Sequence, residues 1–432
     1  LNWTAEQIAF AQRDGLQTLL RHAAEHSPFH RKRLAGMDIA TISPDDLSAL
    51  PVMTKAQMMA ELDDVFTDRR LSQAAVESAL AATGTEPVPI LGDYIALASG
   101  GCSGQRATFV LDRTAVSTFT ASVLRESGPA DPIAEAPGGQ PLMAFVSSPS
   151  AVHATGMLAA LTSAGAAPVR SGLVPATAAL GEIVARLNAL QPGVLTGYAS
   201  MLSRLAAEAS GGRLRIAPAM VNSTSETLLP EMRAAIRDAF GVPVVDAFGS
   251  TEGLVGKTCP DDDVFVFNTD VCIVELVDSE NRPVAPGASS AKVLVTNLYN
   301  LTQPLIRYEL TDAFVRQPDA KESGYLRARV QGRNDDVLRY GSVEVHPIAI
   351  RSVLVTTPQV LDYQVRQTRC GIEVFAVTPE GPHLETLSDR LRRALIDSGL
   401  RIPDVAVRPV DGLDRHAVTG KFRRFVPFTG TG

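Results

Sequence analysis

Two stretches decide the fold of this chain: NSTSET at Asn222–Thr227 and VVDAFGSTEG at Val244–Gly253. Each contains the end of a short apolar run that is followed by small polar residues. The residues between them, 229–240, have the apolar spacing of a helix. Strand, helix and strand in this order form one unit of a parallel sheet, whose ligands usually lie at the carboxyl ends of the strands. The polar residues therefore fall where a ligand is expected, although a strand followed by a plain polar turn is the ordinary alternative.

The same alternation extends from about residue 115 to residue 250. The apolar runs expected to form strands are Leu142–Val146, Gly193–Thr196, Ala219–Asn222 and Val242–Ala247. The helices expected between them cover residues 151–164, 177–190, 199–209 and 229–240. This pattern predicts βα units and a largely parallel sheet.

Beyond residue 260 the pattern changes to short strands, expected at 264–268, 272–277, 292–296 and 314–315. Helices are expected over 4–35, and Thr54 is expected to cap a further helix. After a boundary near 332–337, the expected elements are helices at 347–356 and 384–398 and strands at 360–367 and 372–377. The predicted fold class is α/β: a large N-terminal domain (1–334) with βα-built sheets and a β-rich subdomain, and a small C-terminal α/β domain (335–432).

The composition argues against several function classes. The net charge is −7 over 432 residues and no lysine/arginine stripe is visible, which argues against nucleic-acid binding. No apolar run reaches the length of a membrane span, and the first residues show no signal peptide. The four cysteines are far apart, which suits neither a disulfide framework nor a zinc knuckle. We therefore expect a cytoplasmic protein that binds neither nucleic acid nor membranes.

A loop rich in glycine and serine lies upstream, between strands expected at 94–98 and 107–111. It comprises Ser99, Gly100, Gly101, Cys102, Ser103 and Gly104. Glycine adopts unusual φ values without a side-chain clash, so such a loop brings backbone N–H groups close to phosphate oxygens. The loop lacks the Gly-Lys-Ser/Thr ending of a Walker A motif. A plain hairpin is the ordinary alternative.

With its Gly-Ser-Thr-Glu ending, the stretch at Val244–Gly253 resembles the adenylate-forming superfamily, which includes acyl- and aryl-CoA ligases, the adenylation domains of peptide synthetases, and luciferases. The resemblance implies that Phe248 stacks on adenine, Thr251 binds the α-phosphate and Glu252 holds Mg²⁺. It also implies that Asp246 lies beside the adenine amino group. The other nucleotide contacts that it implies here are Ser225, Glu226, Thr227, Gly249 and Ser250.

Three further motifs follow in the superfamily's order. LIRYELTD at Leu305–Asp312 resembles the Arg-Tyr-x-x-x-Asp motif, which implies that Asp312 binds the ribose hydroxyls. GRNDD, which begins at Gly332, resembles the hinge motif and implies that Arg333 contacts the nucleotide and that Asp335 is the hinge. The sequence Thr-Gly-Lys ending at Lys421 resembles the last motif, whose lysine approaches the substrate carboxylate and the α-phosphate. The C-terminal domain is therefore expected to be mobile and to carry a catalytic lysine.

The nearest branch is the short phenylacetate-CoA-ligase-like one. SPFHRKRL at Ser27–Leu34 and LPVMTK at Leu50–Lys55 resemble its opening segments, so the resemblance spans nearly the whole chain. The phosphate loop departs from the superfamily's pattern, since Cys102 replaces a hydroxyl residue and Arg106 replaces a proline. The handling of the leaving pyrophosphate is the step that this departure puts in question.

The resemblance also places the acid between the strand end after the phosphate loop, the helix near His153 and the loop before the glutamate motif. The candidate residues are Ser148, His153, Gly197, Tyr198, Asn222, Ser223, Gly249 and Leu254. Tyr198 is expected to form a wall for an aromatic ring, and His153, Asn222 and Ser223 to hydrogen-bond ring substituents. These residues favour a substituted benzoate or another aryl acid. Packing on an apolar helix is the ordinary role for His153.

These motifs predict an acid–CoA ligase. The acid attacks the α-phosphate of Mg-ATP to give an acyl-adenylate and pyrophosphate, and the thiol of coenzyme A then takes the acyl group. Catalysis rests on positioning and charge stabilisation, without a side-chain nucleophile. Two alternatives stay open: transfer to an amine, a hydroxyl or a carrier-protein thiol, and a non-catalytic nucleotide-binding relative. The oligomeric state is also open, with a homodimer as one option.

Overall fold

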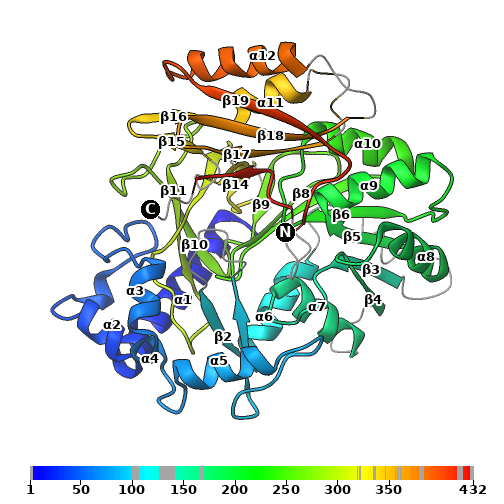
Figure 1. Cartoon of the computed structure of the whole chain (residues 1–432). Coiled ribbons are helices and arrows are strands. Elements are labelled where there is room, and N and C mark those ends of the chain that lie inside the picture. The colour runs from blue at the N-terminus through cyan, green and yellow to red at the C-terminus, as the bar shows by residue number, and fades with distance from the viewer. Residues whose placement is uncertain are drawn as a thin grey trace. The chain divides into compact units, whose positions relative to one another are not determined.

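The computed structural model describes residues 3–99, 107–125, 142–164, 170–318, 320, 323–333, 337–345, 347–355, 357, 360, 362–378, 384–415 and 422–428. Its contacts divide the chain into two units (Figure 1). The first is Leu1–Gln331, and the second comprises Gly332–Ala417 and Phe422–Gly432.

The first unit is built around a nine-stranded sheet with the strand order β13-β14-β9-β8-β7-β6-β5-β3-β4. The strands β4, β3, β5, β6 and β7 are parallel, and β8, β9 and β14 continue the sheet in antiparallel fashion. The strand bounds are β3 Leu142–Ser147, β4 Arg170–Pro175, β5 Val194–Tyr198, β6 Met220–Thr224, β7 Val244–Gly249, β8 Val255–Thr258, β9 Phe265–Phe267, β13 Asp312–Arg316 and β14 Arg327–Arg333.

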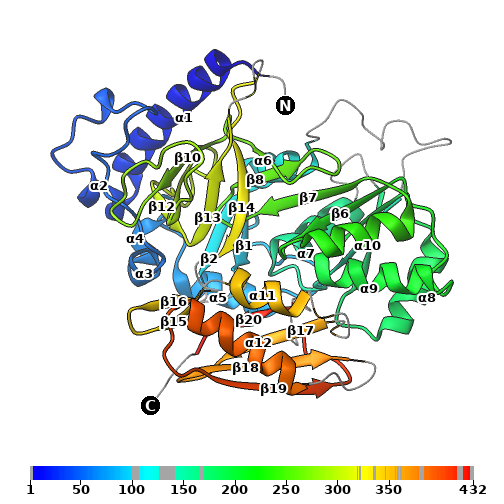
Figure 2. The same cartoon turned by 90° about the horizontal axis from the view of Figure 1, so that it is seen from above.

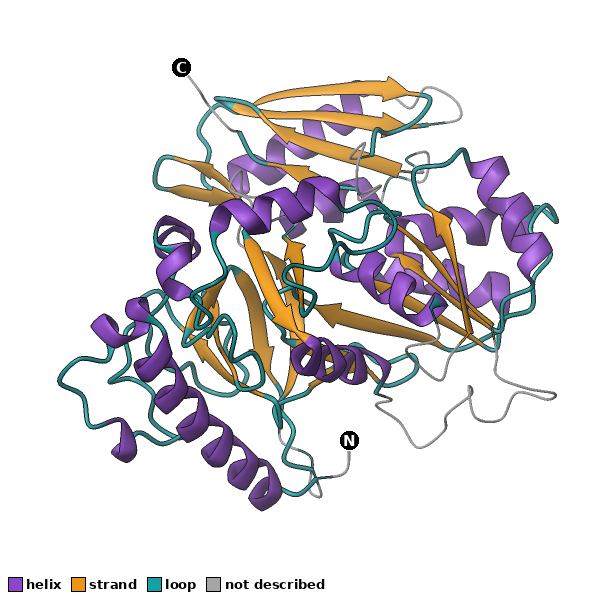
Figure 3. Ribbon diagram, turned by 90° about the horizontal axis from the view of Figure 1, so that it is seen from below, coloured by secondary structure: helices purple, strands orange, loops and turns teal. Residues whose placement is uncertain are grey.

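Helices cover both faces of the parallel strands, as Figures 2 and 3 show. On one face, alternate strand residues such as Val146 and Leu195 form a buried cluster with α8 (Leu180–Leu190), α9 (Ala199–Ser210) and α10 (Pro230–Phe240). On the other face, Phe145 and Val245 pack against α7 (Ala154–Ser163). The helix α6 (Arg113–Leu124) packs against α7 and β8. Period-two alternation thus gives each strand two apolar faces, and both are covered.

A β-rich part adjoins this sheet in the same unit. It contains the antiparallel sheet β10-β11-β12 and the hairpin β1-β2. Their bounds are β1 Tyr94–Ala98, β2 Thr108–Asp112, β10 Cys272–Val277, β11 Lys292–Asn297 and β12 Tyr308–Leu310. A single apolar cluster joins these strands to β9 and β13, so the two parts share one core.

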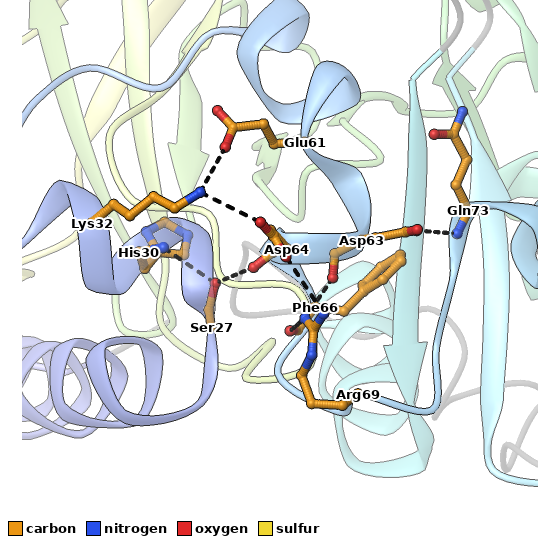
Figure 4. A network of polar contacts seen from close by, with 9 residues as sticks. All are labelled: Ser27, His30, Lys32, Glu61, Asp63, Asp64, Phe66, Arg69 and Gln73. Atoms are coloured by element: carbon orange, nitrogen blue, oxygen red, sulfur yellow. Dashed lines mark hydrogen bonds and ion pairs between the residues drawn. The ribbon is translucent and has the colours of Figure 1, made fainter.

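The N-terminal segment supplies α1 (Ala5–His26), α2 (Pro28–Arg33), the 3₁₀ turn η1 (Ile39–Thr41), α3 (Lys55–Ala60), α4 (Leu62–Val65) and α5 (Gln73–Ala82). Thr54 caps α3 in a capping box with Gln57, as its sequence predicts. Figure 4 shows how α2 and α4 are tied together: the Ser27 hydroxyl donates to the Asp64 carbonyl oxygen at 2.8 Å. The ammonium of Lys32 also lies 3.5 Å from the Asp64 carboxylate, but this exposed pair contributes little stability.

The second unit contains the four-stranded sheet β19-β18-β17-β20 and the hairpin β15-β16. Its bounds are β15 Leu338–Tyr340, β16 Val343–Val345, α11 Pro347–Val355, β17 Asp362–Gln367, β18 Gly371–Val377, α12 Leu384–Asp397, β19 Asp404–Val410 and β20 Phe425–Val426. Both helices contribute leucine or isoleucine side chains to one buried cluster with the sheet. This unit therefore has a hydrophobic core of its own.

The predicted α/β class is confirmed, and each predicted strand and helix of the parallel sheet lies within a few residues of its observed position. The predictions missed the helices α5 and α6, the edge strands β4 and β19, and several short strands of the β-rich part and of the second unit, namely β8, β12, β14, β15, β16 and β20. β4 begins at the exposed Arg170 and has a mostly half-exposed pattern, so its apolar signal is weak. Within the described residues, no helix combines the length and the apolar character that a membrane span requires.

Candidate functional site

The predicted ligand-binding residues meet at the carboxyl ends of β5, β6 and β7. The parallel register places Gly197 opposite Ser223, and Ser223 opposite Asp246. Asn222 lies one residue earlier on β6, with its amide nitrogen 3.5 Å from the Thr196 hydroxyl. Residues far apart in the chain thus form one polar edge, as expected for a parallel sheet.

Asp246 is a buried carboxylate at this edge, with 8% of its surface exposed. Burial raises its pKa to about 7, while the charge of Arg233 and the hydroxyl of Ser223 act in the opposite direction. Its backbone N–H donates to the Thr258 hydroxyl on β8 at 3.0 Å, which fixes the strand on the antiparallel side. Asp246 therefore titrates near neutral pH in a fixed position.

Phe248 is half-buried beside Asp246 and belongs to an aromatic cluster. Its ring makes edge contacts with Phe267 at 5.7 Å and with Phe314 at 5.3 Å between ring centroids. Those two rings stack on each other at 4.9 Å. A Cβ at Gly256 would lie 2.6 Å from the Phe267 ring, so glycine leaves the space that this cluster occupies. The orientation of Phe248 is consequently set by its neighbours.

The turn that carries Glu252 is closed by its own backbone. The N–H of Ser250 donates to the Leu254 carbonyl oxygen at 2.9 Å, and Gly253 has a φ of +103°. A side chain at Gly253 would meet Asn297 and Tyr299. Glu252 itself is 8% exposed, and Thr251 precedes it with a partly exposed side chain. A carboxylate and a hydroxyl are hard oxygen donors, so this pair has the donor chemistry that Mg²⁺ prefers.

The predicted adenine-lining residues after β6 have mixed surroundings. Ser225 has a φ of +67°, which is a strained backbone conformation for a residue other than glycine. The carboxylate of Glu226 accepts from the Ser200 backbone N–H at 3.0 Å and from the Ser200 hydroxyl. Ser200 lies in the first turn of α9, so Glu226 caps that helix. Thr227 is exposed.

Ser99 closes the base of the glycine-rich loop. Its hydroxyl accepts from the Ala107 N–H at 3.0 Å, and its own N–H donates to the Ala107 carbonyl oxygen. His153 lies next to this base, since its Nδ1 donates to the Ala98 carbonyl oxygen at 3.3 Å. The predicted neighbourhood of His153 and the phosphate-loop strands is thus present in the fold.

Two predicted acid-contacting residues belong to the core instead. Tyr198 is fully buried among the apolar residues under α8 and α9, and its hydroxyl accepts from the Ser148 N–H at 2.9 Å. Leu254 is also fully buried. An exposed aromatic wall at Tyr198 was therefore a wrong expectation, because tight packing and an internal hydrogen bond already occupy that side chain. Gly197 is packed as well, with its would-be Cβ at 3.1 Å from the Val146 carbonyl oxygen.

Asn222 and Ser147 leave polar atoms without a hydrogen-bond partner among the described residues. These atoms are Asn222 Oδ1 and Ser147 Oγ, and both side chains are buried. Asn222 is the middle residue of β6, and Ser147 is the last residue of β3. Buried polar atoms normally have partners, so a ligand group or water is expected there.

The remaining predicted residues fall in three places. Asp312 is the first residue of β13 and is 9% exposed. Gly249 is exposed at the end of β7. Arg333 ends β14, and its side chain lies outside the described residues. The residues Gly100, Gly101, Cys102, Ser103, Gly104, Asp335 and Lys421 also lie outside them.

The sequence motifs missed two residues that contact the Glu252 turn. Asn297 donates from Nδ2 to the Glu252 carbonyl oxygen at 3.0 Å, and the Tyr299 hydroxyl donates to the Gly253 carbonyl oxygen at 3.4 Å. They follow a predicted strand some 45 residues downstream. No local pattern marks a residue whose partner is a distant backbone carbonyl.

Comparisons with known proteins confirm the resemblance. A phenylacetate-coenzyme A ligase of Aromatoleum evansii is 27% identical over 132 residues, and the protein CapK of Staphylococcus aureus is 25% identical over 182 residues. These alignments span only 30% and 39% of those two proteins, and 30% and 40% of this chain. No protein-family model matches the chain.

The fold comparison covers almost the whole chain. A 2-hydroxyisobutyryl-CoA ligase, solved in the postadenylation state with an acyl-AMP, matches with a TM-score of 0.72. The match covers 99% of this chain and 91% of that one at 19% identity. The chain therefore has the fold of the adenylate-forming acyl-CoA ligases.

Proposed function

Since the chain has the adenylate-forming ligase fold, we propose that it is an ATP-dependent acid–CoA ligase. One observation supports this best: Asn222, Ser223, Asp246 and the Glu252 turn, which the motifs single out, lie at adjacent strand ends of that fold. The reaction makes an acyl-adenylate first and a CoA thioester second, with release of pyrophosphate and AMP.

We assign the nucleotide to the edge of β6 and β7. Phe248 stacks on adenine, and the ionised carboxylate of Asp246 accepts from the adenine amino group. Asp312 accepts from the ribose hydroxyls. The remaining contacts come from Ser225, Glu226, Thr227, Gly249, Ser250 and Arg333, and from the loop of Ser99. Glu252 would hold Mg²⁺, which would offset the negative charge of the phosphates.

In the first half-reaction a carboxylate oxygen of the acid attacks the α-phosphorus of ATP. The bond from that phosphorus to the bridging oxygen breaks, and pyrophosphate leaves with the electron pair. Thr251 donates to an α-phosphate oxygen, and the ammonium of Lys421 stabilises the charge on the transferring oxygens. This chemistry needs positioned donors and cations rather than a side-chain nucleophile.

In the second half-reaction the thiol of coenzyme A loses its proton and attacks the acyl carbon, and AMP leaves. We assign residues 335–432 to a small mobile domain that turns about Asp335 between the two half-reactions. This turn withdraws Lys421 and admits the acceptor.

We further propose that the acid is an aryl acid with a hydrogen-bond donor on its ring, such as a hydroxybenzoate or an aminobenzoate. Asn222 Oδ1 is a buried acceptor without a partner among the described residues, and a ring hydroxyl or amino group supplies the missing donor. His153 and Ser223 are further contacts of the ring substituents. Because Tyr198 is buried, the aromatic wall must come from other side chains.

The experiment is a panel of acids tested for acid-dependent ATP–pyrophosphate exchange and for AMP release with and without coenzyme A. Hydroxy- and aminobenzoates should be preferred over benzoate, phenylacetate and 2-hydroxyisobutyrate. AMP release that needs no coenzyme A would favour an amine, hydroxyl or carrier-protein acceptor. If folded protein binds ATP but no acid supports exchange, the ligase proposal fails and a non-catalytic role takes its place.

A further inference from the structure

The segment Asn297–Gln303 holds the Glu252 turn from one side. Asn297, which is 2% exposed, donates to the Glu252 carbonyl oxygen at 3.0 Å and accepts from the N–H groups of Tyr299 and Asn300 at 3.0 Å each. The Tyr299 hydroxyl donates to the next carbonyl, that of Gly253, at 3.4 Å. Two successive peptide units of the turn are thus bound by one segment.

The same segment holds β2 at its other end. The side chain of Gln303 accepts from the Val110 N–H at 2.7 Å and donates to the Thr108 carbonyl oxygen at 3.1 Å. Asn300 donates to the Val110 carbonyl oxygen at 3.0 Å. The Thr302 hydroxyl donates to the Asp112 carboxylate at 3.1 Å. β2 is the strand that leaves the glycine-rich loop.

The segment is also tied internally and is shielded from water. Within the segment, the backbone N–H of Gln303 donates to the Asn300 side-chain oxygen at 3.3 Å. Asn300, Thr302 and Gln303 are 3%, 5% and 0% exposed. Such buried amides have few alternative partners, so their geometry is sharply defined. Glycine at 253 is required for this approach, because a Cβ there would lie 2.2 Å from Asn297 Nδ2.

We propose that Asn297–Gln303 is a positioning segment that fixes the Glu252 turn, and with it the carboxylate assigned to Mg²⁺, relative to β2. Asn297 and Tyr299 are positioning residues of the turn, and Asn300, Thr302 and Gln303 are positioning residues of β2. The inference rests on the proposed function. A purely structural role predicts lost stability without any effect on the turn.

The test uses two isosteric variants that keep the core filled, Tyr299→Phe at the turn and Thr302→Val at β2. The matched control is Tyr94→Phe, which removes a phenol hydrogen bond of 2.6 Å to Asp68 outside the segment. Hydrogen exchange of the ligand-free proteins is followed by mass spectrometry on peptides covering 249–255. Calorimetry measures the affinity for ATP with and without Mg²⁺. The kinetics of ATP–pyrophosphate exchange give kcat and the Mg²⁺ requirement.

Both segment variants should speed exchange in 249–255, including Thr302→Val, whose substitution lies at the far end. Each should raise the Mg²⁺ needed for half-maximal ATP binding by about fivefold, the equivalent of roughly one net hydrogen bond, and lower kcat more than it changes the KM for ATP. Tyr94→Phe should change neither property. The inference is overturned if all three variants lose similar stability with unchanged turn exchange and Mg²⁺ affinity. Absence of acid-dependent activity in the wild type would instead contradict the proposed function. The hydrogen-exchange result for residues 249–255 would still test the positioning role of the segment.

Discussion

At the scale of single residues, Asp246 is a carboxyl group whose pKa is raised by burial and lowered by a nearby positive charge. Its carboxyl is 8% exposed, and burial raises its pKa to about 7 despite the opposing charge of Arg233. An unfolded aspartate has its ordinary pKa near 4. Between these two values the folded protein holds a proton that the unfolded chain has lost.

The sign of the pH dependence follows from this difference. The folded state binds more protons between about pH 4 and pH 7, so the contribution of Asp246 to stability falls as pH rises through that window. The substitution Asp246→Asn removes this pH-dependent contribution to stability. The stability of the variant relative to the wild type should therefore rise by on the order of 2 kcal/mol as the pH rises from 5 to 8.

The measurement is urea unfolding of both proteins at pH 5 and pH 8, with the exposed Asp45→Asn as the control. Asp45→Asn should show a difference from the wild type that does not vary with pH over this range. A pH-independent difference for Asp246→Asn would show that the carboxyl is ionised throughout.

At the scale of elements, Arg307 joins three segments that are distant in the sequence. Its guanidinium donates two hydrogen bonds of 2.9 Å to the Glu275 carboxylate on β10 and one of 2.6 Å to the Leu50 carbonyl oxygen. The strand after it pairs with the opening segment through the Met53 N–H, which donates to the Arg307 carbonyl oxygen. His30 of α2 donates from Nε2 to Pro304 at 2.9 Å. The segments 27–34, 50–55 and 305–312, which the sequence motifs single out separately, thus form one assembly.

Arg307→Met should destabilise the first unit by roughly 3 kcal/mol, because it removes a buried guanidinium and leaves the largely buried Glu275 carboxylate without its partner. The double variant Arg307→Met/Glu275→Leu should recover much of that loss, since neither charge then remains. Chemical denaturation measures both. Equal instability of the single and double variants would mean that the Leu50 contact, rather than the ion pair, holds the assembly.

At the scale of the whole molecule, the proposed reaction uses residues that are widely separated in the sequence, from Ser99 to Lys421. Asp246, Glu252 and Asp312 lie in the unit Leu1–Gln331, whereas Arg333 belongs to the second unit. In our proposal Lys421 serves only the first half-reaction, because the small domain turns about Asp335 before the acceptor enters. The two half-reactions should then respond differently to the loss of one cation.

Lys421→Ala should abolish adenylate formation, measured as acid-dependent ATP–pyrophosphate exchange, and largely spare thioester formation from supplied acyl-adenylate. ATP binding should fall far less than exchange, which separates an enzyme from a nucleotide-binding relative. Lys32→Ala, at an exposed lysine of α2, is the charge-matched control and should leave both half-reactions intact. Equal loss of both halves in Lys421→Ala would contradict the domain rotation.

The sequence by itself determined the α/β class, the parallel order of strands and helices between residues 142 and 249 apart from the edge strand β4, and the resemblance to the adenylate-forming ligases. These features are local: period, turn chemistry and short motifs depend on residues close together in the chain. The positions of Asn222, Ser223 and Asp246 at one edge also followed, because the carboxyl ends of neighbouring parallel strands must meet.

Only the tertiary structure decided what surrounds those residues. It placed Tyr198 in the core, made Glu226 a cap of α9 and brought Asn297 and Tyr299 to the Glu252 turn. It also gave Asp246 its raised pKa. Burial and long-range hydrogen bonds depend on partners tens or hundreds of residues away, and a local sequence pattern does not identify those partners.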